Sequence, residues 1–289
     1  MSQTLQKFLN FARQKLSNIY VEQEAFSVAQ LLLIDMLNIS KSELYANKER
    51  MLTGQEVDRL THAITELEKS KPVQYVLGKT EFYGLPFAVN ESVLIPRQET
   101  EELVDWIVSS FKFRVSNSKF QILDIGTGSG SIAVALAKNL SQAQVTAYDI
   151  SERALEVAKQ NAKQNDVNIT FEPYDILNYQ SSIVNYKFDV IVSNPPYVCE
   201  SEKMEMNSNV LQYEPHLALF VDDSNPLAFY NAIADFALLN LRTKGFLFFE
   251  INRNFSSQAV DMLQQKGFVN VELRNDINGN PRMIRTQYA

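Results

Sequence analysis

The feature that most constrains the fold is a repeated alternation of apolar runs and helical segments after Gln121. Short apolar runs, typical of buried strands, alternate with segments whose apolar residues recur at helical spacing. Such alternation predicts a mostly parallel sheet with helices on both faces, because parallel strands need a crossover connection between them. The runs expected to form these strands are residues 122–125, 144–149, 169–172, 190–192 and 246–251.

The end of the sequence departs from this alternation. Two further strand-like runs, 269–273 and 283–285, flank the turn sequence at 278–281 (Asn-Gly-Asn-Pro) with no helix between them. Runs joined in this way are expected to pair antiparallel. We therefore predict an α/β domain built on a seven-stranded, mostly parallel sheet.

The beginning of the chain follows a different pattern, typical of a small helical bundle. Apolar residues recur at helical spacing over 5–16 and 25–37. Ser40 and Thr53 each offer a helix cap followed by an acidic first turn. We expect residues 1–75 to form a helical domain.

A connecting region joins the two patterns. Aromatic and β-branched residues around Gly84 and Pro86 indicate a hairpin or a short extended connector. A helix with an acidic first turn is expected to begin near Thr100. The predicted organisation is a helical domain at 1–75, a connector at 76–100 and the α/β domain at 101–289.

The composition narrows the classes of function. The 289 residues include 27 Lys and Arg against 34 Asp and Glu, a net charge of −7, so stable nucleic-acid binding is not expected. The single cysteine, Cys199, excludes an intrachain disulfide and a multi-cysteine metal site, and no metal is expected. With no histidine near it in the sequence, it is not expected to be a nucleophile. The absence of a secretory signal and of an apolar stretch of roughly 18–20 residues predicts no membrane association and a cytoplasmic location.

A glycine-rich loop at residues 124–130 (Asp-Ile-Gly-Thr-Gly-Ser-Gly) follows the first strand of the predicted sheet. Ligands of open α/β sheets bind beyond the carboxyl ends of the strands, and glycines permit positive φ and a close approach of backbone to ligand. The Gly-x-Gly-x-Gly spacing is tighter than the Gly-x-Gly-x-x-Gly of dinucleotide folds. Taken alone, such a turn also occurs for packing reasons.

Acidic residues after later strands strengthen the prediction of a nucleotide-like cofactor. Asp149 ends the second strand, where a carboxylate can accept both ribose hydroxyls, although nicotinamide cofactors use the same acid. Asp175, after the third strand, could contact an adenine amino group with Ile176 against the ring, or equally act as a turn or helix cap. Together with Asn194 of the loop described next, the predicted cofactor-binding residues are Asp124, Gly126, Thr127, Gly128, Ser129, Gly130, Asp149, Asp175 and Ile176.

A second loop, Asn194-Pro195-Pro196-Tyr197, follows the fourth strand and indicates the chemistry. An amide nitrogen is a poor nucleophile because its lone pair is delocalised. The Asn194 side-chain oxygen and the Pro195 carbonyl can accept its two N–H hydrogens and stabilise the positive charge that grows on it, while Tyr197 can stack on the planar group. Methyl transfer from a sulfonium needs little beyond proximity and alignment. The two loops predict an S-adenosylmethionine-dependent N-methyltransferase for an amide or amine, with Asn194, Pro195 and Tyr197 as catalytic residues.

Further motifs lie around these loops in a fixed order. They are the stretches at 74–78 (Gln-Tyr-Val-Leu-Gly), 82–84 (Phe-Tyr-Gly), 94–101 (Leu-Ile-Pro-Arg-Gln-Glu-Thr-Glu) and 213–215 (Tyr-Glu-Pro). With the two loops, they resemble the motifs of the release-factor glutamine N5-methyltransferases, often called HemK or PrmC, over nearly the whole chain. Asn-Pro-Pro-Tyr is shared with DNA adenine methyltransferases, whereas the Ile-Pro-Arg and Glu-Thr-Glu stretch is far more specific.

The resemblance carries expectations about fold, cofactor and substrate. It implies a Rossmann-like class I methyltransferase sheet with a small N-terminal bundle, and S-adenosylmethionine as the methyl donor. It implies that the substrate is the glutamine of a Gly-Gly-Gln loop on class 1 peptide-chain release factors, that the bundle helps to dock the factor, and that the protein is a monomer. The expected substrate-binding residues are Asn194, Pro195, Pro196, Tyr197, Arg97 and Glu99.

The sequence departs from the family pattern at two positions. Gln98 stands where the family usually has proline, which should loosen the bend there. Asn252 stands in place of the glycine of a Glu-Ile-Gly stretch. Because asparagine is the non-glycine residue best able to adopt positive φ, we expect the turn to survive.

Two other functions remain open. A DNA or RNA adenine N6-methyltransferase could use the same tetrapeptide, but it needs a basic face and a base-reading element. The acidic chain, with no Lys- or Arg-rich insert, argues against it. A non-catalytic release-factor-binding module could keep the fold without turnover, and the intact glycine loop and Asn194 argue against that.

Overall fold

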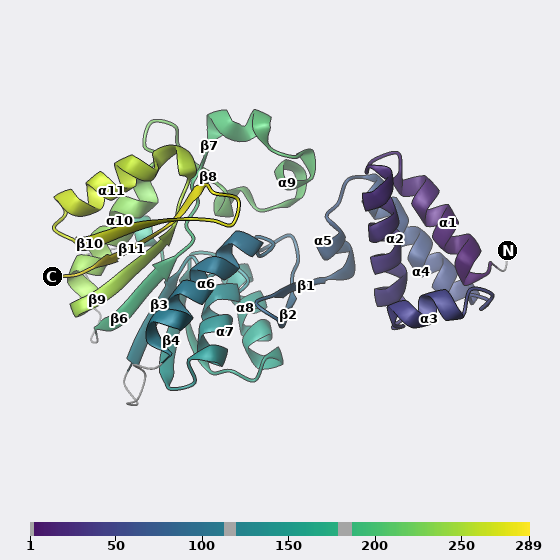
Figure 1. The fold of residues 1–289 in the computed structure, drawn as a ribbon, viewed down its shortest axis with the longest axis horizontal. Coiled ribbons are helices and arrows are strands. Elements are labelled where there is room, and N and C mark those ends of the chain that lie inside the picture. The colour runs from purple at the N-terminus through teal and green to yellow at the C-terminus, as the bar shows by residue number, and fades with distance from the viewer. Residues whose placement is uncertain (1–2, 113–119, 179–186) are drawn as a thin grey trace. The chain divides into compact units, whose positions relative to one another are not determined.

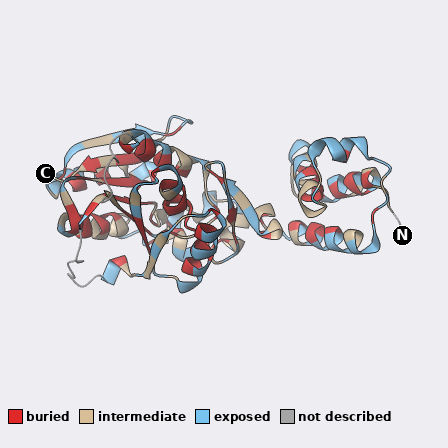
Figure 2. Cartoon of the chain, turned by 90° about the horizontal axis from the view of Figure 1, so that it is seen from below, coloured by how far each residue is buried: buried red, intermediate tan, exposed pale blue. Residues whose placement is uncertain are grey.

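The computed structural model describes residues 3–112, 120–178 and 187–289. It divides the chain into two units, one formed by Met1–Lys79 with Asn207–Tyr213 and the other by Thr80–Met206 with Glu214–Ala289. Each unit has its own buried core, as the burial colours in Figure 2 show. No helix in the described ranges is both long and apolar enough to cross a bilayer.

The first unit is helical, as the sequence predicts. Side chains of Ser40 and Thr53 form capping boxes with Glu43 and Glu56, which fixes where the third and fourth helices begin. A core of leucines, alanines, Phe8 and Ile64 fills the space among the helices. The helices are α1 (Leu5–Leu16), α2 (Glu22–Met36), α3 (Lys41–Ala46), α4 (Gly54–Glu68), α5 (Val73–Leu77) and the distant α9 (Ser208–Tyr213).

The second unit is built on a seven-stranded sheet with the order β10-β11-β9-β6-β3-β4-β5 (Figure 1). Neighbours from β9 to β5 pair in parallel, whereas β11 is antiparallel to both β9 and β10. The predicted mostly parallel sheet and its antiparallel end are confirmed. The strands are β3 (Phe120–Ile125), β4 (Ala143–Asp149), β5 (Ile169–Pro173), β6 (Phe188–Ser193), β9 (Leu241–Glu250), β10 (Val269–Asn275) and β11 (Pro281–Gln287).

Helices cover both faces of this sheet (Figure 1). Alternate residues of one strand enter different cores: Ile122 packs with α6, α7 and α8, and Leu123 with α10 and α11. Because central parallel strands are buried on both faces, they read as continuous apolar runs rather than alternating ones. The helices are α6 (Gln98–Phe111), α7 (Ser131–Asn139), α8 (Glu152–Gln164), α10 (Ala228–Asn240) and α11 (Ser256–Gln265).

The connector contains the predicted hairpin, β1 (Lys79–Phe82) and β2 (Leu85–Ala88). Its turn residues, Tyr83 and Gly84, take φ of 51° and 71°, as a two-residue hairpin turn requires. The next helix, α6, begins at Gln98, two residues before the predicted start at Thr100. A short parallel pair, β7 (Val198–Cys199) with β8 (Phe220–Val221), has no counterpart in the predicted strands.

Candidate active site

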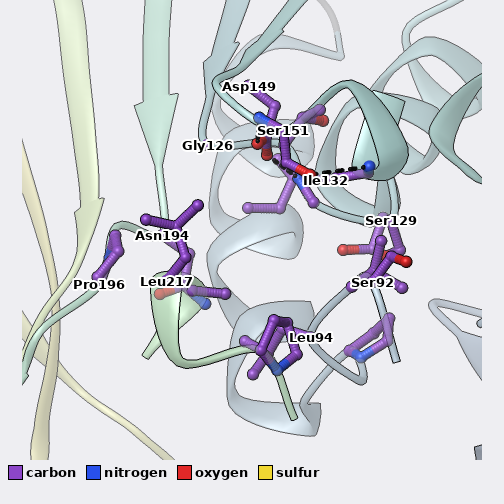
Figure 3. Close-up of a pocket in the computed structure, with 18 of the residues that line it drawn as sticks. Ser92, Leu94, Gly126, Ser129, Ile132, Asp149, Ser151, Asn194, Pro196 and Leu217 are labelled. Carbon is purple, nitrogen blue, oxygen red and sulfur yellow. Dashed lines mark hydrogen bonds between the residues drawn. The ribbon is translucent and has the colours of Figure 1, made fainter. Parts of the chain in front are cut away.

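A cavity of about 820 Å³, open solvent at its mouth included, lies where β3, β4 and β6 end (Figure 3). It belongs entirely to the second unit. Both loops singled out in the sequence contribute to its wall, so residues more than 60 positions apart meet there. The lining residues are Ser92, Val93, Leu94, Pro96, Arg97, Thr100, Gly126, Thr127, Gly128, Ser129, Ser131, Ile132, Asp149, Ser151, Ala154, Asn194, Pro196, Pro215, Leu217 and Ala218.

The three glycines of the loop after β3 serve two purposes. Gly126 and Gly128 line the cavity with φ of +74° and +55°, and a Cβ atom on either would meet no protein atom within 4 Å. Side chains there would occupy open space that a ligand can use. Gly130, with φ of +80°, does not line the cavity, and a Cβ on it would lie 3.0 Å from the Cβ of Ala158 in α8. The first two glycines therefore keep the cavity open, whereas the third permits helix packing.

Asp149 lies at the end of β4 and reaches the cavity with its carboxylate. The backbone N–H groups of Gly128 and Ser151 donate to its two oxygens at 2.8 and 2.9 Å. Burial raises the pKa of Asp149, and these N–H donors oppose the rise. Because each oxygen retains a free lone pair, the carboxylate can also accept the two hydroxyls of a ribose.

Asp124, the acidic residue at the start of the glycine loop, lies behind that loop. Its side chain is fully buried, does not line the cavity, and accepts a hydrogen bond from the Thr127 hydroxyl at 2.6 Å. Burial raises the pKa of Asp124 to about 7, partly opposed by the Thr127 hydroxyl. Asp124 therefore supports the loop from behind. From the sequence, we predicted it among the cofactor-binding residues.

A smaller cavity adjoins the first and shares Gly126 and Pro196 with it. Asp175 and Ile176 both line this smaller cavity. Asp175 also accepts hydrogen bonds from the Leu177 backbone at 3.0 Å and the Asn178 side chain, as a cap of the short helix there. Both interpretations of Asp175 that the sequence leaves open are therefore compatible with its position.

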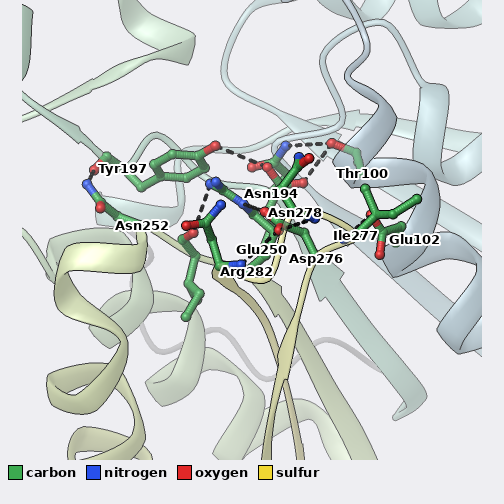
Figure 4. Close-up of polar contacts among 12 residues, drawn as sticks. Thr100, Glu102, Asn194, Tyr197, Glu250, Asn252, Asp276, Ile277, Asn278 and Arg282 are labelled. Atoms are coloured by element: carbon green, nitrogen blue, oxygen red, sulfur yellow. Dashed lines mark hydrogen bonds and ion pairs between the residues drawn. The ribbon is translucent and has the colours of Figure 1, made fainter. Parts of the chain in front are cut away.

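The loop after β6 divides its residues between different surroundings. Asn194 and Pro196 line the larger cavity, and Pro195 lines the smaller one. Tyr197 lines neither of these cavities, and its hydroxyl donates to Glu250 Oε1 at 3.1 Å (Figure 4). Burial and the neighbouring Glu250 raise the pKa of Tyr197. The hydrogen bond places the Tyr197 hydroxyl, and the predicted stacking of its ring on the substrate stays a prediction.

Of the two further residues predicted to contact substrate, only one reaches the cavity. Arg97 lines it and forms an ion pair of 2.6 Å with Glu214, whose side chain is 1% exposed. The other oxygen of Glu214 accepts the backbone N–H of Ile95 at 3.2 Å. Glu99 does not line the cavity, and its neighbour Thr100 does.

Sequence reasoning missed the pairing of Thr100 with Glu250. The Thr100 hydroxyl donates to Glu250 Oε2 at 2.6 Å, and Asn194 Nδ2 donates to the same hydroxyl at 3.3 Å (Figure 4). Burial raises the pKa of Glu250, and the two hydroxyl donors and Arg282 oppose the rise. The sequence did contain one signal for Glu250, which is an acidic residue at the end of an apolar strand. Asp124 and Asp149 also lie at or near the ends of their strands.

The structure also corrects the account of Asn252. Its φ is −68°, so the chain does not use the positive φ that was expected at this position. Its side-chain amide instead donates to the Tyr197 carbonyl at 3.0 Å and to Glu202 at 2.8 Å. Gln98 is the first residue of α6 and lies on its exposed side.

The Cys199 side chain is buried, and burial together with Glu202 raises the pKa of its thiol to about 11. A thiol with so high a pKa is a poor nucleophile near neutral pH. Within the described part of the chain, no group of three or more His, Cys, Asp or Glu side chains could hold a metal ion.

Comparisons with known proteins match both the N-terminal region and the α/β region of the chain. A family model described as a methyltransferase domain matches residues 116–267, and one described as the PrmC N-terminal domain matches residues 7–78. A release factor glutamine methyltransferase from Flavobacterium psychrophilum is 45% identical over 95% of this chain and 96% of its own length. One from Bacteroides thetaiotaomicron is 42% identical over the same shares. A solved methyltransferase from Pyrococcus furiosus aligns with 81% of this chain and 98% of its own, at 16% identity and a TM-score of 0.49.

Proposed function

This chain belongs to the family of release factor glutamine methyltransferases, and we propose that it transfers a methyl group from S-adenosylmethionine to the side-chain amide nitrogen, N5, of a glutamine in a release factor. One observation carries the proposal. The glycine loop and Asp149, suited to a nucleoside, share a single cavity with Asn194, suited to an amide. A methyl donor and an amide acceptor can therefore meet there without a further catalytic group.

The residues present fit S-adenosylmethionine. Gly126 and Gly128 leave open space at the cavity wall, and the Asp149 carboxylate has lone pairs for ribose hydroxyls. Asp175 and Ile176 line the adjoining cavity and would hold the adenine ring. When bound, S-adenosylmethionine supplies a methyl group on a positively charged sulfur.

The chain's own residues act on the acceptor amide. Asn194 Oδ1 and the Pro195 carbonyl accept the two N–H hydrogens of the glutamine side chain. These acceptors bind more strongly as positive charge develops on the nitrogen, so they stabilise the transition state more than the ground state. Arg97, held by Glu214, lies at the same cavity and contributes to substrate binding. Tyr197 braces the loop through Glu250.

We also propose which glutamine is modified and how the release factor is bound. The glutamine is that of a Gly-Gly-Gln loop on class 1 release factors, and residues 1–75 dock the factor without taking part in the chemistry. The matched PrmC N-terminal domain and the printed names of the relatives support this assignment. We further propose that the protein acts as a monomer in the cytoplasm and does not bind nucleic acid stably, in keeping with its net charge of −7.

A tritiated-methyl transfer assay tests the function, with purified release factor and duplex DNA offered side by side. We expect label in the factor alone, located by mass spectrometry on the glutamine of its Gly-Gly-Gln loop. Label in DNA would support an adenine methyltransferase instead. Binding of the factor without transfer would support a non-catalytic module.

The docking role of the N-terminal region has its own test. A chain that begins at Lys71 is compared with the full chain on intact factor and on a short Gly-Gly-Gln peptide. We expect activity on the factor to fall at least roughly tenfold, the equivalent of about 1.4 kcal/mol of lost contacts, and activity on the peptide to fall far less. An equal fall on both substrates would mean that the region supports the active site rather than docking.

A further inference from the structure

The amide of Asn194 is useful to catalysis in only one of its two orientations. Its oxygen and nitrogen have nearly the same shape, so packing alone does not distinguish Oδ1 from Nδ2. With Oδ1 toward the substrate it accepts an N–H from the glutamine. With Nδ2 toward the substrate, two donors face each other and the stabilisation is lost. Some feature of the protein must therefore select the orientation.

Three hydrogen bonds link the Asn194 side chain to the Tyr197 hydroxyl through Thr100 and Glu250 (Figure 4). Asn194 Nδ2 donates to the Thr100 hydroxyl at 3.3 Å, and that hydroxyl donates to Glu250 Oε2 at 2.6 Å. The second oxygen of Glu250 accepts the Tyr197 hydroxyl at 3.1 Å. One carboxylate thus connects to both ends of the loop that begins at Asn194 and ends at Tyr197.

The direction of these bonds follows from counting protons. A hydroxyl has one proton and two lone pairs, and in the structure the Thr100 hydroxyl donates its proton to Glu250 Oε2. The single proton of Thr100 is committed to Glu250, so the hydroxyl can only accept on the side that faces Asn194. It therefore attracts Nδ2 and repels Oδ1.

We propose that Glu250 and Thr100 are positioning residues that hold the Asn194 amide with its oxygen toward the methyl acceptor. The Glu250 side chain is buried and 1% exposed, so water does not compete for its oxygens. Thr100 is 3% exposed and lies in the first turn of α6. The catalytic role of the oriented oxygen rests on the proposed function. Its orientation rests on the hydrogen-bond geometry alone.

The orientation can be measured without catalysis. In 15N-labelled protein, the side-chain amide protons of Asn194 should show nuclear Overhauser contacts to the Thr100 methyl group. In the Glu250→Gln variant, the Thr100 proton is no longer committed to a carboxylate, and these contacts should weaken. Wild-type spectra that place the Asn194 amide protons away from Thr100 would overturn the proposal, whether or not the protein methylates a release factor.

Kinetics provide the second test, on the methyl acceptor that the wild-type protein uses. Thr100→Val removes the hydroxyl and keeps the shape, and we expect kcat to fall roughly fivefold, the value of one net hydrogen bond. Thr100→Ser, the matched control, keeps the hydroxyl and should restore most of that loss. The affinity for S-adenosylmethionine, measured by calorimetry, separates an effect on the amide from an effect on the cavity wall.

A double-mutant cycle separates positioning from a general structural role. If Thr100 acts through Asn194, then Thr100→Val should cause no further loss of kcat in the Asn194→Ala background. A structural role would lower kcat by the same factor in both backgrounds, and that result would contradict the proposal. Serine failing to restore kcat, in folded protein that binds S-adenosylmethionine, would contradict it as well.

Discussion

Two buried carboxyl groups support the two loops of the site, and they do so across very different distances along the chain. Asp124, at β3, accepts the hydroxyl of Thr127, only three residues away, at 2.6 Å. Glu250, at the end of β9, accepts the hydroxyl of Thr100, 150 residues away, also at 2.6 Å. The cofactor loop is therefore supported locally, and the substrate loop by contacts that exist only in the assembled sheet.

The same contrast extends to the rest of each loop. The cofactor loop owes its form to glycine φ angles and to backbone groups, such as the Gly128 N–H that donates to Asp149. The substrate loop owes its form to side chains from α6 and β9, with Asn252 holding the Tyr197 carbonyl. We therefore expect substitutions in the cofactor loop to change cofactor binding, and substitutions around the substrate loop to change turnover.

The largest effect is expected for Asn194→Ala. Loss of one preorganised acceptor of the reactive N–H should lower kcat on the order of 10²–10³-fold. The affinity for S-adenosylmethionine, measured by calorimetry, should stay largely unchanged. Asn139→Ala, at an exposed asparagine of α7, is the matched control and should retain full activity. Near-normal turnover of the Asn194→Ala variant with saturating cofactor would contradict the mechanism.

A smaller effect of a different kind is expected for Asp149→Ala. A carboxylate that bridges two ribose hydroxyls acts equally in ground and transition states, so its loss should raise KM for S-adenosylmethionine and leave kcat nearly unchanged. A hydrogen bond to a charged group contributes about 1.5–3 kcal/mol, so the loss of even one of the two should raise KM roughly tenfold to hundredfold. Unchanged affinity in calorimetry would mean that the end of β4 does not contact the ribose.

The two loops also differ in how much of them could be predicted from the sequence. The antiparallel pairing of the last two strands, the positive φ of Gly126 and Gly128, and the place of Asp149 all follow from local patterns. The pairing of Thr100 with Glu250 does not, because no local rule joins residues 150 positions apart.

The partner of the Tyr197 hydroxyl was likewise not predictable from local sequence patterns. The Tyr197 ring was predicted to stack on the planar group of the substrate, and that role stays a prediction. In the folded chain its hydroxyl reaches Glu250, 53 residues further along. Asn252 likewise was expected to adopt positive φ, because the family pattern has glycine at this position. Its φ is −68°, and its side-chain contacts to Tyr197 and Glu202 became visible only in the structure.

A matched pair of glycine variants tests the division of labour within the cofactor loop. Alanine at either Gly128 or Gly130 should lose about 1–2 kcal/mol of stability, because both positions have positive φ. Gly130→Ala should lose about 1–3 kcal/mol more, since its Cβ would lie 3.0 Å from Ala158. Gly128→Ala should instead weaken S-adenosylmethionine binding, because its Cβ enters the cavity. Urea unfolding and calorimetry measure the two effects, and equal behaviour of the two variants would contradict the distinction.

The smallest expected effect concerns Asp124, the buried acid that supports the cofactor loop. It appears as a dependence of the protein's stability on pH. Burial raises the pKa of Asp124 to about 7, well above the value of about 3.9 for an unfolded chain. Between those values the folded protein binds a proton that the unfolded chain does not bind. The group therefore contributes stability that is complete below about pH 4 and is lost as pH rises through about 7.

Asp124→Asn removes this titration while keeping an acceptor for the Thr127 hydroxyl. From pH 6 to pH 8 the wild-type protein should lose about 1.4 kcal/mol of unfolding free energy through Asp124, and the variant should lose none through this site. The difference between variant and wild type, followed by urea unfolding at pH 6, 7 and 8, should therefore shift in favour of asparagine as pH rises. A difference that stays constant, or shifts the other way, would mean that Asp124 is already ionised at pH 6. The Thr127 hydroxyl would then stabilise the charge more than burial penalises it, and the cofactor loop would be supported by an ion rather than by a neutral acid.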